Sequence, residues 1–252
     1  MKLTNRLSDL FRKTPEPEPD DLPPPLAPIQ PDIPIAVIGD VHGCVSQLER
    51  LLPKIPDGWV ILCVGDVIDR GEHSREAVEL LLSRPDITVI QGNHEAMMLD
   101  FLSNPLERGR AWLRHGGLQT LASYNIGGVT LNSRGPRLVE AADALRAAIG
   151  PKALQWFSDM PALRWTGNVA VVHAGADPAA PINEQPQSQF IWGHAEFEQT
   201  RRADGIWVVH GHTIVPEPYA AEGRIAVDTG AYATGRLTAG LISPDGVRFV
   251  HS

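Results

Sequence analysis

The 252-residue sequence contains only two cysteines, Cys44 and Cys63, and no long apolar run. Two cysteines cannot form a disulfide framework, which excludes a disulfide-rich secreted scaffold. No apolar run approaches the roughly 20 residues that cross a bilayer, and the N-terminus lacks the apolar core of a secretory signal. These absences predict a cytoplasmic protein without a transmembrane segment.

Positive charge is scarce as well, since 22 Lys and Arg stand against 30 Asp and Glu and give a formal net charge of −8. Such a balance disfavours a general affinity for nucleic acid phosphates, so we expect no nucleic-acid polymer as partner. Hydrophobic residues make up 43% of the chain, which is enough for a substantial buried core.

Motifs of several common chemistries are missing. The sequence has no Gly-x-Gly-x-x-Gly after its first predicted strand, no phosphate loop ending in Gly-Lys-Ser/Thr, and no Gly-x-Ser-x-Gly nucleophile elbow. His94-Glu95 is not followed three residues later by a second histidine, because Met98 stands there, which excludes a zincin.

Prolines are concentrated at the N-terminus, where nine of the 22 fall within residues 1–34. Because proline lacks an amide hydrogen, we expect residues 1–33 to be a disordered, Pro-rich tail and residues 34–252 to form one folded domain. The tail also contains a short amphipathic segment, for which a frayed terminus and a weak docking element remain two alternatives. Its apolar face consists of Leu3, Leu7, Leu10 and Phe11.

From residue 35 onward, short β-branched runs alternate with helical patterns, which is typical of an α/β domain. The predicted strands are Ile35–Ile38, Trp59–Val64, Ile87–Ile90, Val169–Val172, Ile206–Val209, Arg224–Val227, Leu237–Ile242 and Val247–Val250. The predicted helices are Ser46–Leu52, Glu76–Ser83, Glu95–Leu102 and a helical cap over Arg137–Phe157, broken near Gly150-Pro151.

Five of the predicted strands end in polar clusters. Because the carboxyl ends of strands in an open α/β sheet share one edge, where ligands bind, the five clusters predict a single site. They are Gly39-Asp40-Val41-His42-Gly43, Gly65-Asp66-Val67-Ile68-Asp69-Arg70-Gly71, Gly92-Asn93-His94-Glu95, His173-Ala174-Gly175 and Gly211-His212-Thr213.

These clusters supply six oxygen and nitrogen ligands and no thiolate, which favours Mn²⁺, Fe or Zn²⁺ over a soft metal. Six protein ligands are too many for one tetrahedral zinc ion but suit two adjacent divalent ions bridged by a carboxylate. The candidate metal ligands are Asp40, His42, Asp66, Asn93, His173 and His212.

The five clusters resemble the five motifs of the calcineurin-like metallophosphoesterases. The first three have the patterns Gly-Asp-x-His-Gly, Gly-Asp-x-x-Asp-Arg-Gly and Gly-Asn-His-Glu. More narrowly, they are similar to the phosphoprotein phosphatase branch, which includes bacterial and phage serine/threonine phosphatases. The similarity extends from about residue 35 to residue 242. It implies a β-sandwich of two mixed sheets flanked by helices, with the site at the C-terminal ends of the strands.

The resemblance also implies a role for each ligand. Asp40 and His42 would hold the first metal ion and Asp66 would bridge the two ions. The second ion would be held by Asn93, His173 and His212. Both ions would most simply be Mn²⁺.

For catalysis, the resemblance implies that a hydroxide shared by the two ions attacks phosphorus in line. His94 would be the general acid for the leaving group, Asp69 would orient its imidazole, and Arg70 would bind the phosphoryl oxygens.

The sequence departs from these relatives at the second phosphate-binding position. Related phosphatases often carry an arginine two residues after a tryptophan like Trp192, where this sequence has His194. Either His194 replaces that arginine in binding substrate, or Arg201 or Arg202 reaches in from the next segment. Gln91 likewise stands where relatives often have arginine.

Three functions follow from these residues. The first is a serine/threonine phosphoprotein phosphatase, with a phosphorylated protein as partner, and its support is the Asp69-Arg70-Gly71 signature. The alternative is a symmetrical diadenosine tetraphosphate hydrolase with the same metal centre. The third is an inert docking protein, which the presence of all six ligands disfavours. In each case we expect the tail to localise the protein rather than to take part in chemistry.

Overall fold

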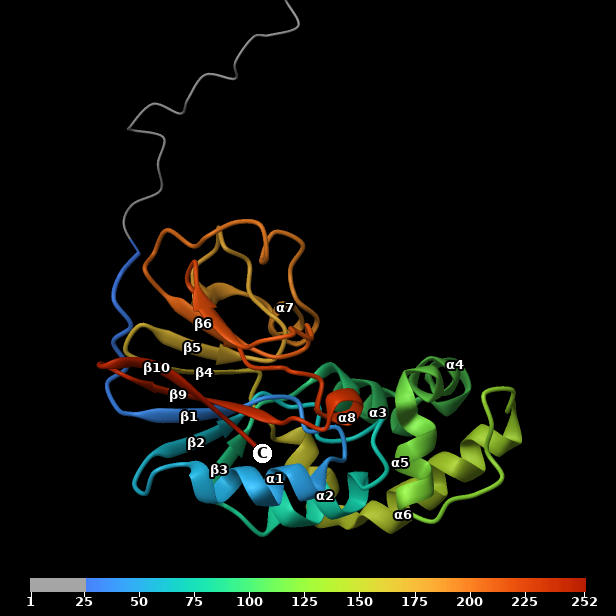
Figure 1. Cartoon of the computed structure of the whole chain (residues 1–252). Helices are drawn as coiled ribbons and strands as arrows, with labels where there is room; N and C mark the ends of the chain where they lie inside the picture. The colour runs from blue at the N-terminus through green and yellow to red at the C-terminus, as the bar shows by residue number, and fades with distance from the viewer. Residues whose placement is uncertain (1–25) are drawn as a thin grey trace, which may run out of the picture.

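The computed structural model describes residues 26–252, which form two stacked five-stranded sheets with helices around them (Figure 1). The first sheet has the order β10-β9-β1-β2-β3 and the second the order β4-β5-β6-β8-β7. In each sheet three strands run parallel, β1-β2-β3 and β5-β6-β8. The pairs β1/β9 and β9/β10 in the first sheet and β4/β5 and β7/β8 in the second are antiparallel. The expected α/β sandwich of two mixed sheets flanked by helices is therefore confirmed.

The strands of the first sheet are β1 Ile35–Ile38, β2 Val60–Cys63, β3 Ile87–Val89, β9 Thr238–Ser243 and β10 Gly246–His251. Those of the second are β4 Leu163–Thr166, β5 Val169–Val172, β6 Trp207–His210, β7 Tyr219–Ala221 and β8 Arg224–Ala226. The predicted strands match eight of these, whereas β4 and β7 were not predicted. Both are partly exposed edge strands, so their residues lack a continuous apolar run.

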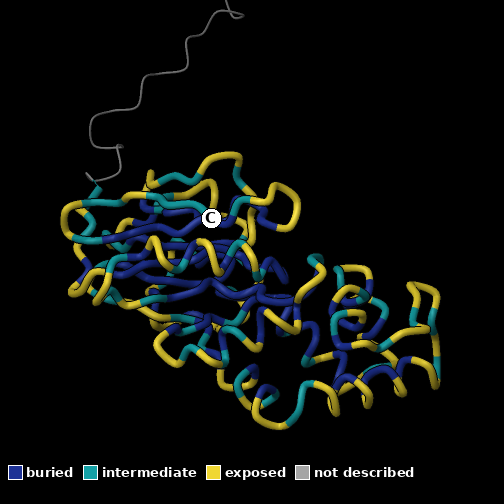
Figure 2. Tube along the Cα trace, turned by 60° about the horizontal axis from the view of Figure 1, so that its bottom comes forward, coloured by how far each residue is buried: buried dark blue, intermediate teal, exposed yellow. Residues whose placement is uncertain are grey.

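Strand β1 shows how the sandwich buries its apolar residues. Ile35 and Val37 face the second sheet, whereas Ala36 and Ile38 face the helices, because successive side chains of a strand point to opposite sides. All four residues are buried, which explains why the strand is a continuous apolar run rather than an alternating one. Figure 2 shows these buried strands in the interior, surrounded by exposed loops.

Helices α1 and α2 cover the outer face of the first sheet, and α4, α5 and α6 form a lobe beside the sandwich (Figure 1). We call this lobe, residues 105–158, the cap. The helix α6 is broken at Gly150, which has a φ of 76°, in agreement with the predicted break. The helical bounds are α1 Val45–Leu51, η3 Leu52–Lys54, α2 Ser74–Leu82, α3 Asn93–Ser103, α4 Pro105–Trp112, η4 Leu113–Gly117, α5 Leu118–Ser123, α6 Pro136–Ser158, η5 Ile182–Glu184, α7 Gln187–Trp192 and α8 Ala231–Thr234.

The segment before β1 is packed onto the domain, which corrects the domain boundary predicted at residue 34. Leu26 and Ile29 contact the apolar cluster between the sheets, and the indole N–H of Trp207 donates to the Ala27 carbonyl at 2.8 Å. The folded domain therefore includes residues 26–33.

The predicted amphipathic segment lies outside the described residues. Within residues 26–252, no helix has the length and apolar character needed to cross a membrane.

Candidate active site

The six predicted ligands lie where the carboxyl ends of the parallel strands of both sheets meet. Three of the polar clusters follow β1, β2 and β3 of the first sheet, and two follow β5 and β6 of the second. The site is thus shared by two facing sheets rather than lying on the edge of one open sheet. All of the six are buried except His212, which is exposed.

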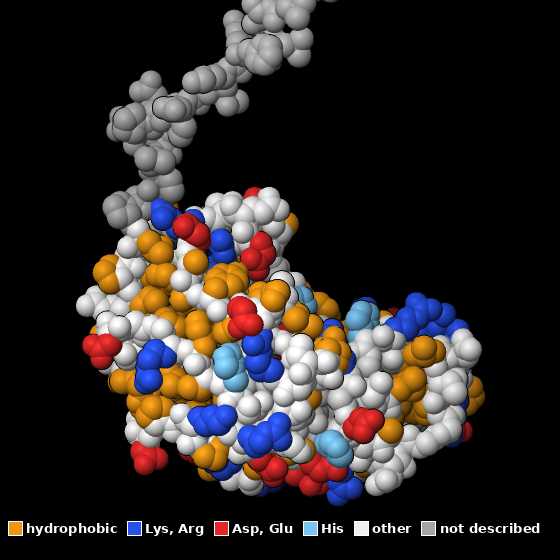
Figure 3. Space-filling view, viewed as in Figure 1, with side chains coloured by type: hydrophobic (Ala, Val, Ile, Leu, Met, Phe, Trp, Pro, Cys, Tyr) orange, Lys and Arg blue, Asp and Glu red, His pale blue; other side chains and the backbone are white. Residues whose placement is uncertain are grey.

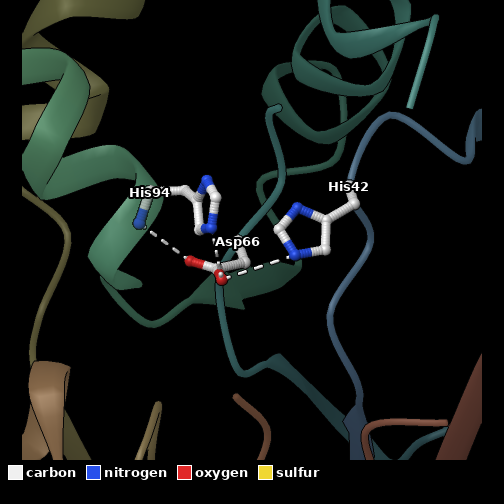
Figure 4. A group of neighbouring side chains, drawn as sticks. All are labelled: His42, Asp66 and His94. Atoms are coloured by element: carbon white, nitrogen blue, oxygen red, sulfur yellow. Dashed lines mark hydrogen bonds and ion pairs between the residues drawn. The ribbon is translucent and has the colours of Figure 1, made fainter. Parts of the chain in front are cut away.

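Asp66 lies at the centre of the cluster. One carboxylate oxygen, Oδ2, is 3.5 Å from Nε2 of His42 and 3.5 Å from Nε2 of His173. Figure 4 shows the imidazoles of His42 and His94 approaching this carboxylate from two different segments. Asp66 belongs to two groups of candidate ligands, the first with His42 and His94 and the second with His173 and His212, and within each group the ligand atoms all lie within 4.8 Å of one another. A carboxylate common to two ligand groups fits the bridge of a dinuclear centre.

Asn93, at the start of α3, completes the second group. Its side-chain oxygen lies 2.8 Å from Nε2 of His173 and 2.9 Å from Nδ1 of His212. Three ligand atoms from three loops therefore point to one location.

The orientation of the histidines also fits a metal site. Nδ1 of His42 donates to the Ile68 carbonyl at 2.8 Å, and Nδ1 of His173 donates to the Val64 carbonyl at 2.8 Å. Since a carbonyl only accepts, each ring carries its proton on Nδ1 and presents an unprotonated Nε2. Burial lowers the pKa of His42 to about 3, which favours the neutral form that binds metals.

Asp40 brings a second buried carboxylate to the cluster. It accepts the backbone N–H of His212 at 3.1 Å, and a Cβ on Gly211 would lie only 1.9 Å from its Oδ1, so this approach requires glycine. Burial, followed by the negative charges of Asp228 and Asp66, raises the pKa of Asp40 well above its usual value. Bound divalent cations would relieve this repulsion, because buried carboxylates are stable when they pair with positive charge.

Asp69 and His94 form a buried hydrogen-bonded pair beside these ligands. Nδ1 of His94 lies 2.7 Å from Oδ2 of Asp69, and the same oxygen accepts the indole N–H of Trp112 at 2.8 Å. Thr120 donates to the other oxygen of Asp69. Nε2 of His94 is buried without a hydrogen-bond partner and lies 3.8 Å from Oδ2 of Asp66. A free imidazole nitrogen held in this orientation is able to donate a proton to a leaving group.

Arg70 lies at the rim of the site, where Tyr232 of α8 positions it. Its guanidinium donates to the Tyr232 hydroxyl at 3.2 Å and lies 5.0 Å from the centre of the ring. The Tyr232 ring in turn contacts His42 edge-on, with 5.3 Å between the ring centres. A planar guanidinium beside the ligand cluster is suited to bind phosphoryl oxygens.

His194 is not part of this group. It lies in an adjoining pocket of about 280 Å³, which Trp192 and His212 also line, and its Nε2 is 3.8 Å from Oδ2 of Asp177. The two arginines considered in its place point elsewhere. Arg202 is buried against Asp204 and the carbonyl oxygens of Asp177 and Ala180, and Arg201 lies 3.8 Å from Glu222.

Comparison with known proteins identifies this arrangement. Residues 33–216 match the model of the calcineurin-like phosphoesterases. The chain belongs to this family. The resemblance suggested by the five polar clusters is therefore confirmed, and the family uses a dinuclear metal centre.

Among curated proteins, the chain is similar to a bis(5'-nucleosyl)-tetraphosphatase PrpE [asymmetrical] of Bacillus thuringiensis (strain Al Hakam). The two are 27% identical over 234 residues, which cover 81% of this chain and 88% of the relative. Among solved structures, a putative diadenosine tetraphosphatase has a TM-score of 0.60 at 20% identity and covers 90% of this chain and 98% of its own. A cold-active protein-tyrosine phosphatase of Shewanella sp. has a TM-score of 0.56 at 19% identity, with coverages of 88% and 83%. These structural likenesses show a shared fold.

In this phosphoesterase, two further buried carboxylates, Glu95 and Asp228, lie beside the ligands. The buried carboxylate of Glu95 accepts the backbone N–H groups of Asp66 at 2.9 Å, Val67 at 2.8 Å and Gly92 at 3.0 Å, which fixes the loop that carries Asp66. Asp228, also buried, follows β8 and lies near Asp40. The sequence offered one signal for Asp228: like the five polar clusters, it directly follows a predicted strand.

Proposed function

We propose that this phosphoesterase hydrolyses dinucleoside polyphosphates, with serine/threonine-phosphorylated protein as the second candidate substrate. The observation that supports phosphoryl hydrolysis is the buried Asp69–His94 pair, whose unpartnered Nε2 faces the shared carboxylate of Asp66. A pair of this kind holds an imidazole in the orientation needed to protonate a leaving oxygen.

In this proposal, the six ligands would hold two divalent ions, most simply Mn²⁺. Asp40 and His42 would hold one ion, Asn93, His173 and His212 would hold the other, and Asp66 would contribute to both. When bound, the ions supply Lewis-acid stabilisation of the phosphoryl oxygens and an activated water. His94 donates its proton at Nε2, and Arg70 binds the phosphoryl group.

The choice of a dinucleotide rests on the relatives and on one feature of the site. The PrpE relative is named as a tetraphosphatase of bis(5'-nucleosyl) substrates. Beside His212, the side chain of Trp192 is 50% exposed on the wall of the adjoining pocket. An exposed indole provides a flat surface for stacking a nucleobase, which contributes about 1–3 kcal/mol per base.

A turnover comparison tests this choice. Protein loaded with Mn²⁺ is assayed with diadenosine tetraphosphate, a phosphothreonine peptide and a phosphotyrosine peptide, and the nucleotide products are separated. We expect the highest kcat/KM with the dinucleotide and, as in the relative's name, asymmetrical cleavage to AMP and ATP. Two ADP molecules would instead indicate the symmetrical reaction, and a higher kcat/KM with either peptide would overturn the proposal.

The phosphoprotein alternative is favoured by the Asp69-Arg70-Gly71 signature and by the exposure of the rim. Tyr232 and Trp192 are both more than one-third exposed, so a phosphorylated loop of another protein has access to Arg70. This alternative predicts preference for the phosphothreonine peptide in the same assay.

For either substrate we propose a cytoplasmic location, with which the two buried, unpaired cysteines agree. Immunoblotting of fractionated cells tests this location.

A further inference from the structure

One segment of the cap reaches the catalytic groups from outside the five polar clusters. The ring of His115 in η4 lies 6.5 Å from the ring of His94, measured between centres. The carbonyl of Gly116 accepts the backbone N–H of Arg70 at 3.4 Å. Segment η4, which contains Arg114, therefore lies beside the catalytic groups.

Three arginines gather on this part of the cap, and we call them the cap arginine cluster: Arg110, Arg114 and Arg134. Arg110 and Arg114 lie four residues apart on one side of the helical segment. The positive charge of Arg134, then burial, then the charge of Arg114 lower the pKa of Arg110. In Figure 3, Lys and Arg side chains gather over α4, on the side of the cap that faces the notch beside the sandwich.

This cluster lacks a protein counter-charge. Among residues 26–252, none of the three arginines forms an ion pair with an acidic side chain. Nε of Arg110 is buried without a hydrogen-bond partner, and Arg134 donates only to the backbone carbonyls of Leu131 and Ser133. The three positive charges repel one another, and no acidic side chain neutralises them. A group of this kind is therefore suited to an anion that binds from solvent.

We propose that the cap arginine cluster binds the phosphates of a polyphosphate chain that lie beyond the scissile bond. The inference rests on the proposed dinucleotide function, because a phosphomonoester carries a single phosphoryl group, for which Arg70 and the metal ligands suffice. A tetraphosphate chain brings further negative charges that extend away from His94. Arg110 and Arg114 lie four residues apart, so both project from one side of the helical segment, and guanidinium forks bind phosphate oxygens.

The test is the double variant Arg110→Gln/Arg114→Gln, assayed as the Mn²⁺-loaded full chain. We expect its kcat/KM for diadenosine tetraphosphate to fall at least 10-fold, mainly through KM, and to become less dependent on salt concentration. Turnover of p-nitrophenyl phosphate stays within two-fold of wild type. The matched control is Arg108→Gln, on the same helix but about 200° around its axis from Arg110; it leaves both activities unchanged. Equal losses on both substrates, or no loss on the dinucleotide, would overturn the inference.

A binding measurement separates this inference from the proposed function. Inhibition of p-nitrophenyl phosphate hydrolysis is compared for inorganic tripolyphosphate and orthophosphate at a fixed concentration of free Mn²⁺. The cluster predicts stronger inhibition by tripolyphosphate in the wild type and loss of that preference in the double variant, even if the dinucleotide proves not to be a substrate. No preference in the wild type, with the double variant instead losing activity on an acidic phosphopeptide, would assign the cluster to peptide binding and contradict the inference.

Discussion

At the scale of single residues, Asp66 connects the two halves of the candidate metal centre. Its Oδ2 is equally distant from His42 and His173, and its Oδ1 accepts the backbone N–H of His94 at 3.0 Å. Burial disfavours its charged form, whereas His173, His94 and His42 in their protonated forms, together with the backbone N–H of His94, lower the pKa of Asp66 below its usual value.

Substitution Asp66→Asn should therefore remove metal as well as activity, because an amide lacks the charge that a bridging ligand shares between two ions. We expect loss of at least one of two ions per chain by elemental analysis, together with loss of turnover. Asp245→Asn, at an exposed turn, is the matched control and retains both. Full metal occupancy in Asp66→Asn would contradict the bridging role.

His94→Asn tests the general acid. Because Nε2 is the only unpartnered buried nitrogen facing Asp66 among the described residues, its loss should cut turnover of a phosphothreonine peptide by about 10²- to 10⁴-fold. The effect should be smaller on p-nitrophenyl phosphate, whose leaving group needs less protonation. Metal content should not change. An unaltered rate on the peptide would remove His94 from catalysis.

Trp112 is a positioning residue that acts through Asp69. In Trp112→Phe the indole donor to Oδ2 is lost while an aromatic ring remains stacked near Phe101. A lost hydrogen bond of this kind is worth about 1–3 kcal/mol to a buried carboxylate, so kcat should fall about 10-fold and its pH profile should shift. Trp156→Phe, whose indole is not among the hydrogen-bond donors to Asp69, is the control. An unchanged profile with reduced stability alone would mean that Trp112 has only a packing role.

At the scale of elements, the junction between η4 and α5 determines where Arg70 lies. Gly116 has a φ of 108°, and a Cβ at this position would lie 2.5 Å from the backbone nitrogen of Arg70. The sequence predicted β1, β2 and β3 and the helices α1, α2 and α3 that follow them, but not this junction. The periodic spacing of apolar residues identifies buried strands and helices, whereas a π-helical turn depends on the contacts that the cap makes with the loop after β2.

Gly116→Ala should displace Arg70 and raise KM for p-nitrophenyl phosphate by about 10-fold, as expected for a weakened charge-assisted contact of about 1.4 kcal/mol. Gly150→Ala is the matched control, since Gly150 also has a positive φ, of 76°, but nothing within 4 Å of an added Cβ. It should lower stability by about 1–3 kcal/mol through backbone strain and leave KM unchanged. An equal KM in both variants would contradict the positioning role of Gly116.

At the scale of the whole molecule, the segment before β1 closes one side of the sandwich. The backbone of Gln30 donates to the side chain of Asn168 at 2.7 Å, and the carboxylate of Asp32 accepts the backbone N–H of Gly167 at 2.8 Å. These contacts join residues 26–33 to the hairpin of β4 and β5, more than 130 positions away in the sequence.

Two truncations test this assignment. A chain that begins at residue 26 should keep the thermal midpoint and the turnover of a small phosphate ester, because the tail is expected to localise the protein only. A chain that begins at residue 34 should lose about 2–4 kcal/mol of stability, from several hydrogen bonds and the contacts of Leu26 and Ile29. Thermal unfolding measures both. Equal midpoints for the two truncations would show that residues 26–33 do not stabilise the domain.

The sequence by itself determined eight of the ten strands of the described chain, the polar clusters that follow five of them and the candidate ligand set. This is because each cluster is a short local motif in which a strand ends, a glycine allows a turn and a metal-binding side chain follows. Only the tertiary structure decided that His42 and His173 both approach the carboxylate of Asp66. It also decided that Trp112 and Thr120 donate hydrogen bonds to Asp69, and that His194 is directed toward Asp177. Such contacts join residues far apart in the chain, so they depend on how the sheets and the cap pack rather than on local sequence pattern.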